Sequence, residues 1–167
     1  MERKVSKRYF LGGAGAAIAA ALVGGFAMRG SEASAEGFEV SLSPEQWRAR
    51  LRPDQYRVLR QAGTERAGSS PLDREHRRGT FVCAGCSLPV YRSQDKFDSG
   101  TGWPSFVRPI PNAVRTRPDN SLFASRTEVH CRRCGGHLGH VFDDGPRPTG
   151  KRYCMNGIAM RFIPARG

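Results

Sequence analysis

The chain is short of acidic residues. It contains 15 Asp and Glu against 27 Lys and Arg in 167 residues, which gives a formal net charge of +12. A basic surface of this size permits nucleic acid, anionic lipid or acidic proteins as partners without selecting among them, and a solvated basic surface explains it equally well. The charge by itself therefore assigns no function.

The chain also lacks internal repeats beyond two CxxC units, and no long low-complexity tract follows its N-terminal segment. No flavin or nicotinamide signature is visible, which argues against a redox enzyme built on those cofactors. Hydrophobic residues make up 38% of the chain, and 20 glycines and 11 prolines favour short strands and turns over a helical bundle. The length suits one domain of ordinary size with an extension.

Residues 1–35 have the pattern of an export signal. An apolar run from Leu11 to Met28 is rich in Ala and Gly, and it lacks the Leu, Ile and Phe density of a good membrane-spanning helix. The small-residue pattern "ASA" then precedes Glu36, as at a cleavage site. The basic region before the run contains four cations: Arg3, Lys4, Lys7 and Arg8.

The stretch "SKRYFLGG" resembles a twin-arginine signal with Lys7-Arg8 in place of the arginine pair, so the route stays open between twin-arginine and general secretion. We expect export to the periplasm or another extracytoplasmic space, with tethering to the membrane by an uncleaved signal as the alternative. Five basic and two acidic residues contribute +3 to residues 1–35 and leave +9 for the remainder.

Residues 36–78 are expected to form a leader with two short helices, belonging to the same domain as residues 79–167. Ser43 is a candidate N-cap, and Gln46 completes a capping box three residues later. Trp47 and Leu51 are four residues apart and would share one face. Pro53 interrupts this helix.

A second helix is predicted from Asp54 to Gly63, its stop signal. Residues 64–79 are expected to form an irregular connection.

Short runs rich in β-forming residues follow from Thr80 onward, at residues 80–83, 88–93, 113–118, 122–131 and 158–164. The tetrapeptide "PDNS" at 118–121 predicts a hairpin turn. We therefore predict a β-rich α+β fold in which short N-terminal helices lead into antiparallel strands.

Four of the five cysteines form two CxxC pairs, "CAGC" and "CRRC", which supply Cys83, Cys86, Cys131 and Cys134. Two such turns can complete a tetrahedral S4 site, the preferred closed site for structural Zn²⁺. Glycines at 85, 135 and 136 suit tight turns. Two disulfides are an alternative in an oxidising compartment, and a thioredoxin-like CxxC is a weaker one because no βαβ pattern is present.

Cys154 is the unpaired cysteine. A buried structural thiol is one interpretation. Arg152 and Asn156, each two residues away, would lie on its side of a strand, and a nearby cation lowers the pKa of a thiol. Together with His137 and His140 of "GHLGHVF", this pattern is typical of nucleophilic thiol catalysis.

The stretch "SGTGWPSF" at 99–106 places Trp103 on a glycine-rich loop. It is either a packed aromatic turn or the wall of a small apolar pocket.

Taken together, "KFDSGTGWPSF", "CRRCGGHLGHVFDDGPRPTGKRYCMN" and the CxxC pairs resemble the methionine-R-sulfoxide reductase B family, from about Ser43 to Pro164. The resemblance implies two small antiparallel sheets with peripheral helices, one structural zinc, and reduction of the R epimer of methionine sulfoxide in proteins and peptides. It implies that Cys154 is the nucleophile, that His137 and His140 protonate and position the oxygen, and that Asn156 and Arg152 orient and activate the site. The resemblance also implies that Trp103 and Phe142 contact the substrate.

This chain has Thr101 where many members of that family carry a resolving cysteine. We therefore expect a one-cysteine enzyme whose sulfenic acid is reduced by an external thioredoxin-like protein or small thiol. A monomer with no nucleic-acid partner is expected. The rivals are a zinc-ribbon-like nucleic-acid module, which leaves "GHLGHVF", "GWPSF" and Cys154 unexplained, and a thiol-disulfide oxidoreductase acting through a CxxC.

Overall fold

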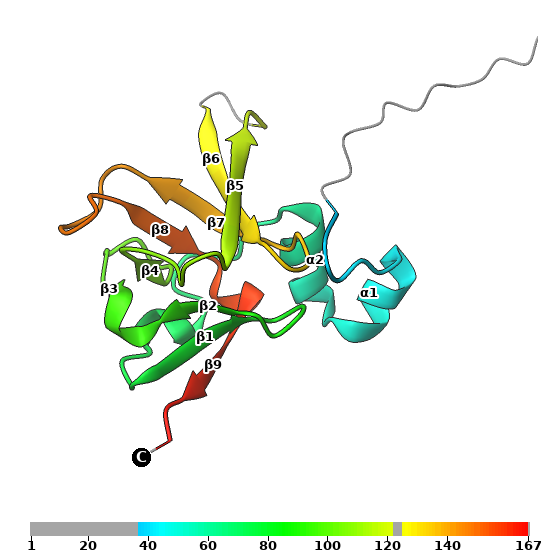
Figure 1. Ribbon diagram of the computed structural model, residues 1–167, viewed down its shortest axis with the longest axis horizontal. Helices are drawn as coiled ribbons and strands as arrows, with labels where there is room; N and C mark the ends of the chain where they lie inside the picture. Colours follow the sequence, from blue (N-terminus) through cyan, green and yellow to red (C-terminus); the bar gives the residue numbers. More distant parts are fainter. Residues whose placement is uncertain (1–36, 122–124, 167) are drawn as a thin grey trace, which may run out of the picture. The chain divides into compact units, whose positions relative to one another are not determined.

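The computed structural model of the chain describes residues 37–121 and 125–166 (Figure 1). The predicted export signal at 1–35 lies outside these residues. The described part forms two antiparallel sheets with two short α-helices at its N-terminal end, which confirms the predicted β-rich α+β class. No helix in this part of the chain has the length and apolar character needed to span a membrane.

The first helix, α1, spans Pro44–Arg50 and has the predicted cap. The Ser43 hydroxyl accepts from the Gln46 N–H at 3.2 Å, and the Gln46 side chain accepts from the Ser43 N–H at 2.8 Å. These bonds satisfy two N–H groups that a helix start otherwise leaves unpaired. Trp47 and Leu51 are both buried, as their spacing predicts.

The second helix, α2, spans Pro53–Gln61. It begins one residue before the predicted start because a proline, which lacks an N–H, fits the first helical position. Ala62, with φ 50°, adopts the left-handed conformation that ends the helix, so the prediction of Gly63 as the stop was wrong by one residue. In the connection predicted to be irregular, Pro71–Arg74 form one 3₁₀ turn, η1.

A three-stranded sheet has the order β2-β1-β9, so the C-terminal strand pairs with the first strand of the chain. All its pairings are antiparallel. Its strands are β1 (Gly79–Cys83), β2 (Pro89–Arg92) and β9 (Met160–Pro164).

A six-stranded antiparallel sheet has the order β3-β4-β8-β7-β6-β5. Its strands are β3 (Lys96–Phe97), β4 (Ser105–Phe106), β5 (Val114–Asp119), β6 (Arg126–Cys131), β7 (His137–Phe142) and β8 (Arg152–Met155). The 3₁₀ turns η2 (Ser93–Asp95) and η3 (Gly157–Ala159) precede β3 and β9. The β-rich runs predicted from the sequence missed β3, β4, β7 and β8, although the expected position of Arg152 beside Cys154 assumed a strand there.

The β5–β6 hairpin forms as predicted, but its turn was misplaced. Pro118 and Asp119 still belong to β5, where they pair with Thr127 and Arg126. The connection therefore starts at Asn120, after the first two residues of "PDNS".

An aromatic core lies behind the strand that carries Cys154. The Tyr91 and Phe106 rings stack with centroids 4.3 Å apart, and Phe81 meets Phe106 edge-on at 5.0 Å. The Tyr91 hydroxyl donates to the Met155 sulfur at 3.0 Å. Because successive strand residues point to opposite faces, Met155 anchors β8 in the core while Cys154 faces away from it.

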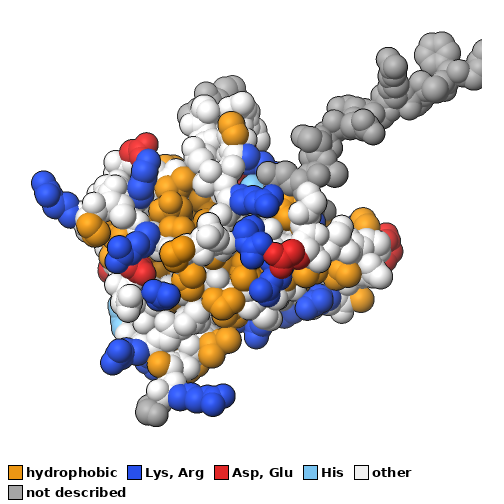
Figure 2. Space-filling view, viewed as in Figure 1, with side chains coloured by type: hydrophobic (Ala, Val, Ile, Leu, Met, Phe, Trp, Pro, Cys, Tyr) orange, Lys and Arg blue, Asp and Glu red, His pale blue; other side chains and the backbone are white. Residues whose placement is uncertain are grey.

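The basic balance of the sequence is visible on the surface. The face shown in Figure 2 carries more Lys and Arg side chains than Asp and Glu side chains, with hydrophobic atoms between them. Several arginines are nevertheless paired with carboxylates, among them Arg77 with Glu75 at 2.6 Å.

Candidate active site and metal centre

The four paired cysteines converge at one buried point, with all their sulfurs within 4.8 Å of one another. The Cys83 and Cys134 sulfurs are 3.7 Å apart, and those of Cys86 and Cys131 are 3.5 Å apart. A tetrahedron with Zn–S bonds of about 2.3 Å has edges of about 3.8 Å. A disulfide needs sulfurs about 2.05 Å apart, and none of the five cysteines forms one. The donor set fits a tetrahedral thiolate-binding metal.

Two equivalent turns hold these sulfurs. The Cys83 N–H donates to Leu88 and the Ser87 N–H donates back to Cys83; in the second turn the same offsets link Cys131 with Gly136 and Gly135. Ser87, with φ 61°, and Gly135, with φ 67°, occupy the matching left-handed position. Gly85 lies within the first turn, but neither Gly85 nor Gly136 has a positive φ, so only Gly135 occupies a position that favours glycine for its conformation.

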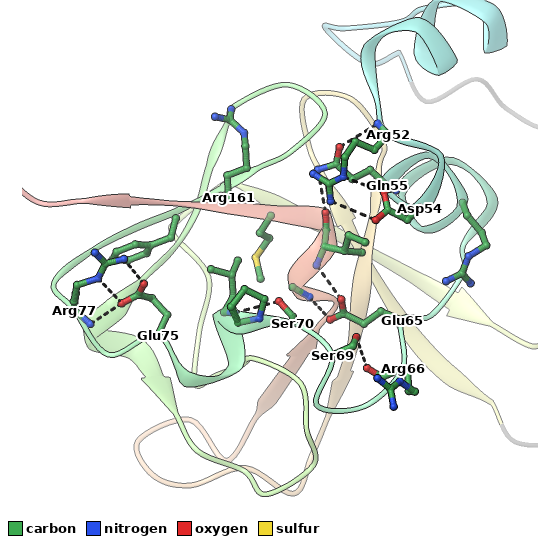
Figure 3. Close-up of a pocket in the computed structure, with 17 residues that line it drawn as sticks. Arg52, Asp54, Gln55, Glu65, Arg66, Ser69, Ser70, Glu75, Arg77 and Arg161 are labelled. Atoms are coloured by element: carbon green, nitrogen blue, oxygen red, sulfur yellow. Dashed lines mark hydrogen bonds and ion pairs between the residues drawn. The ribbon is translucent and has the colours of Figure 1, made fainter.

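None of the predicted catalytic residues lines a large depression of about 780 Å³ that α2, residues 65–77 and β9 help to form (Figure 3). Three of them, Cys154, His140 and Asn156, line a smaller hollow of about 160 Å³. Arg152 lines a separate hollow with Thr101, and His137 is buried and lines neither hollow. The smaller hollow is lined by Thr64, Trp103, Arg126, Gly139, His140, Phe142, Cys154 and Asn156.

Strand register brings the reactive side chains into one row. Cys154 on β8 lies opposite Ser105 on β4 and opposite His140 on β7. His140 in turn lies opposite Glu128 on β6, and Glu128 lies opposite Arg117 on β5. Residues opposite one another in antiparallel strands share a face. A thiol, an imidazole and a carboxylate therefore lie side by side across the sheet.

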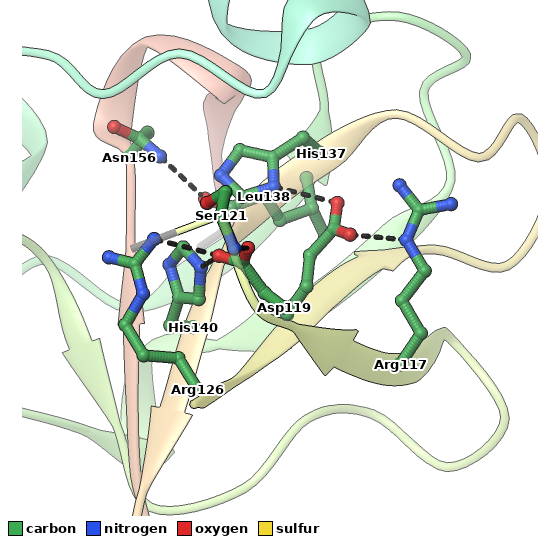
Figure 4. A network of polar contacts seen from close by, with 9 residues as sticks. Arg117, Asp119, Ser121, Arg126, His137, Leu138, His140 and Asn156 are labelled. Atoms are coloured by element: carbon green, nitrogen blue, oxygen red, sulfur yellow. Dashed lines mark hydrogen bonds and ion pairs between the residues drawn. The ribbon is translucent and has the colours of Figure 1, made fainter. Parts of the chain in front are cut away.

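Each histidine is held by a carboxylate (Figure 4). His137 Nδ1 lies 2.8 Å from Glu128, which also pairs with Arg117. His140 Nε2 lies 2.7 Å from Asp119, which Arg126 contacts at 2.7 Å. Glu128 and Asp119 are site residues that the sequence analysis missed. Arg126 and Glu128 are two residues apart on β6, and this spacing of charged residues on one strand face was a signal for Glu128.

These contacts shift several pKa values. Burial would raise the pKa of Glu128, but the hydrogen bonds from His137 and Arg117 outweigh it and lower the pKa to about 2. Hydrogen bonds from Ser121, and then from His140, hold the pKa of Asp119 well below its usual range. Burial lowers the pKa of His140, partly opposed by Asp119. Both carboxylates are thus ionised at neutral pH, and His140 is mainly neutral.

Arg152 lies on the same strand face as Cys154, as predicted, and Phe142 is its cross-strand partner. Its guanidinium lies over the Phe142 ring at 4.4 Å and binds Asp144 through two bonds of 2.9 and 2.7 Å. Asp144 raises the pKa of Arg152, and Cys154 adds to this effect. A permanent cation therefore stands beside the thiol.

Asn156 follows the end of β8, and its amide is turned into the protein. Its oxygen accepts from the Glu65 N–H at 2.9 Å, and its nitrogen donates to the Leu138 carbonyl at 3.2 Å. It still lines the hollow beside Cys154. The expectation that it shares a strand face with Cys154 was wrong, because the strand ends at Met155.

Trp103 lines the hollow from a loop that is docked on residues 64–68. Its indole N–H donates to the Glu65 carbonyl at 3.2 Å, and the Gly68 N–H donates to the Gly102 carbonyl at 2.7 Å. Gly102 has a φ of 85°, and a Cβ there would lie 2.8 Å from the Gly68 nitrogen, so the close approach requires glycine.

A hydroxyl chain leads away from the thiol. The Thr101 hydroxyl lies 3.8 Å from the Cys154 sulfur, and Ser99 lies 2.8 Å from both Thr101 and Ser105. Thr101, the position at which the sequence analysis noted the absence of a resolving cysteine, therefore lies beside Cys154. Cys154 itself is partly exposed, in contrast to the four buried cysteines.

Comparison with known proteins agrees with this arrangement. The family profile described as the SelR domain matches residues 51–164. A peptide methionine sulfoxide reductase MsrB of Leptospira interrogans is 49% identical over 126 residues, which cover 75% of this chain and 96% of the relative. An MsrB of Leifsonia xyli is 52% identical over 129 residues, covering 76% and 93% respectively.

A plant relative extends the comparison. The chloroplastic peptide methionine sulfoxide reductase B1 of Arabidopsis thaliana is 52% identical over 122 residues, covering 72% of this chain and 60% of the relative. Proteins that are about half identical over nearly all of the described residues share the same fold. The chain therefore belongs to the MsrB family, the peptide methionine sulfoxide reductases that carry a SelR domain.

Proposed function

We propose that this protein reduces the R epimer of methionine sulfoxide in proteins and peptides, with Cys154 as its nucleophile. The observation that carries the proposal is the position of Cys154, partly exposed at a hollow walled by Trp103, Phe142 and His140. A sulfoxide reductase needs a reactive thiol, a proton source and an apolar slot for the methyl group, and this hollow offers all three. The names of the relatives support the substrate class.

The reaction balances without a further cofactor. The Cys154 thiolate attacks the sulfoxide sulfur while the sulfoxide oxygen takes up a proton. The S–O bond of the sulfoxide and the transient S–S bond then break as the oxygen becomes bonded to the Cys154 sulfur, and methionine leaves. The sulfoxide is reduced by two electrons, and Cys154 is oxidised to a sulfenic acid. Arg152 supplies a positive charge beside the reacting sulfur.

The proton comes from His137 and His140 in this proposal. Each ring uses one nitrogen for a carboxylate, so its other nitrogen carries a proton only in the imidazolium form. Asp119 stabilises that form of His140, as a carboxylate does beside a catalytic imidazole. His137 Nε2 is buried and has no hydrogen-bond partner among the described residues, so it stays available for the oxygen in this proposal.

Two external thiols then regenerate the enzyme. They convert the sulfenic acid into a thiol and water and leave as a disulfide. Thr101 beside Cys154 supplies no internal thiol, and the other cysteines are held at the metal centre. We propose a thioredoxin-like protein or a small thiol as the donor.

We also propose Zn²⁺ as the metal of the Cys83, Cys86, Cys131 and Cys134 site. A closed S4 site has no open position, so the ion links β1 to β6 and takes no part in the reaction. Metal analysis of freshly purified protein tests this: one zinc per chain is expected, and another metal or none would refute it.

We further propose that residues 1–35 direct export, on the basis of their basic, apolar and small-residue pattern. N-terminal sequencing of protein recovered from an exporting host tests the predicted end at Ala35.

The activity is tested with a peptide carrying racemic methionine sulfoxide and dithiothreitol as reductant, for the wild type and Cys154→Ser. The wild type should consume the R epimer alone, and the variant should consume neither. Consumption of the S epimer, or turnover by the variant, would contradict the proposal.

A further inference from the structure

Glu65 lines the large depression in Figure 3, and the residue before it, Thr64, lines the small hollow with Cys154. Glu65 belongs to the connection that the sequence analysis predicted to be irregular, and no sequence motif pointed to it. It is nevertheless only 6% exposed, which is unusual for a glutamate. A buried carboxylate of this kind needs compensating partners.

The backbone of Glu65 binds two residues of the candidate active site. Its N–H donates to the Asn156 side-chain oxygen at 2.9 Å. Its carbonyl accepts from the Trp103 indole N–H at 3.2 Å. Both side chains line the hollow, so the position of this one backbone segment sets two of its walls.

The carboxylate of Glu65 fixes the segment that follows Asn156. It accepts from the Gly157 N–H at 2.5 Å and from the Ile158 N–H at 3.1 Å, the first two N–H groups of η3. Burial raises the pKa of Glu65, whereas these two N–H groups lower it. The backbone at Gly157 also lies close to Ser70: a Cβ at residue 157 would be 2.0 Å from the Ser70 hydroxyl oxygen, so the segment leaves no room for a side chain there.

We propose that Glu65 is a positioning residue for sulfoxide reduction, one that clamps Asn156 and Trp103 in the geometry the reaction requires. This inference rests on the proposed function of the site. Glu65 touches neither Cys154 nor the hollow, and it acts through its ties to residues 156–158 and to the tryptophan loop.

The Glu65→Gln substitution separates this role from simple burial. A glutamine has nearly the same size, but its single amide oxygen accepts from one N–H group while its NH₂ faces the other. One N–H of Gly157 or Ile158 then loses its partner, and the segment with Asn156 shifts. Glu65→Asp keeps the charge on a shorter side chain and should recover part of the function.

Glu75→Gln is the matched control. Glu75 lines the same large depression but pairs with Arg77, away from residues 156–158. The kinetic readout is kcat/KM for the R-sulfoxide peptide, and urea unfolding of each variant reports stability. The structural readout is the Trp103 indole N–H signal in ¹⁵N NMR and its hydrogen exchange. The chain has two tryptophans, and Trp103→Phe identifies the signal.

For Glu65→Gln we expect a loss in kcat/KM of between about tenfold and a hundredfold, carried mainly by kcat, because small misplacements of a reacting geometry have effects of this size. The Trp103 indole signal should shift and exchange faster. Glu65→Asp should fall between this variant and the wild type, and Glu75→Gln should match the wild type in both readouts.

The positioning role is refuted if folded Glu65→Gln keeps kcat/KM within about twofold of the control, or if its Trp103 signal stays unchanged. If Glu65→Gln does not fold, Glu65→Asp decides by the same two criteria. A wild type inactive on both epimers would instead refute the proposed function, while the indole signal would still test the clamp.

Discussion

Cys154 on β8 lies directly opposite His140 on β7, so the thiol and the imidazole share one face of the six-stranded sheet. Adjacent strands add Glu128 and Asp119, which bind His137 and His140 respectively. The site is thus built mainly from strand register, and its loops contribute Trp103 and Thr101. Rigid strands suit such a site because small displacements of reacting groups lower the rate.

The carboxylate of Asp119 should control the pH dependence of the reaction. It raises the pKa of His140 against the effect of burial, so Asp119→Asn lowers that pKa further and reduces the imidazolium fraction. The alkaline limb of kcat/KM should move to lower pH, with a loss of about tenfold near pH 8 and a smaller loss near pH 6.

A pH profile of R-epimer reduction checks this, with Asp143→Asn as control, because Asp143 is exposed and pairs with Lys151. Superimposable profiles for Asp119→Asn and the wild type would show that Asp119 does not tune His140.

Glu128 should contribute stability that disappears in acid. Its pKa in the folded protein is about 2 against an ordinary value of 4.5, so its ionised form stabilises the fold at pH values above about 4.5. This contribution declines as the pH falls towards 2. The wild type should exceed Glu128→Gln by at most about 3 kcal/mol in free energy of unfolding near pH 7, and by much less near pH 3.

Urea unfolding of both proteins over this pH range measures the difference. Because both proteins keep the four metal-site cysteines, acid release of the metal affects them alike. If the difference in free energy of unfolding between the wild type and Glu128→Gln grew towards acidic pH, it would contradict stabilisation by the ionised Glu128.

The sequence predicted the parts of the fold that depend on neighbouring residues. The capping box of Ser43 and Gln46, the shared burial of Trp47 and Leu51, and the turn within each CxxC pair follow from short spacings. The predicted position of Arg152 beside Cys154 follows from strand alternation. Each of these signals lies within a few residues of the chain.

The remainder depends on contacts between distant segments. The "GHLGHVF" segment contains two glycines and two histidines, so its composition did not indicate β7. The pairing of β8 between β4 and β7 joins residues about fifty and fifteen positions apart, which no local pattern specifies. Glu65 reaches Gly157 across 92 residues, and its role emerges only in the folded chain.

Loss of the metal should lower the stability of the fold, although it removes no residue of the candidate active site. Cys86→Ser removes one ligand of a site that links two sheets, and we expect Tm to fall by more than about 10 °C, because zinc-binding free energy is folding free energy. Thermal unfolding with zinc quantification checks this. Cys154→Ser is the matched control, since it should lose activity while keeping Tm and metal content; equal Tm values for both variants would contradict a structural metal.

Thr101→Cys should convert the protein to a two-cysteine mechanism. The Thr101 hydroxyl lies 3.8 Å from the Cys154 sulfur, so a thiol at this position lies within reach of the sulfenic acid after a small rotation. After one turnover without reductant, the variant should contain a disulfide between residues 101 and 154, found by peptide mapping. Ser99→Cys serves as a comparison, because the Ser99 hydroxyl contacts Thr101 and is thus one step further along the hydroxyl chain from Cys154. Persistence of the sulfenic acid in Thr101→Cys would show that residues 101 and 154 cannot form a disulfide.

The central claim is that Cys154 alone accepts the oxygen of the sulfoxide. The most direct test is a single turnover of the reduced wild type with excess racemic sulfoxide peptide and no reductant, followed by mass spectrometry of the intact and digested chain. We predict one methionine formed per chain, one added oxygen located on Cys154, and four unmodified metal-site cysteines. A disulfide that includes Cys154, or oxygen on any other cysteine, would contradict the account.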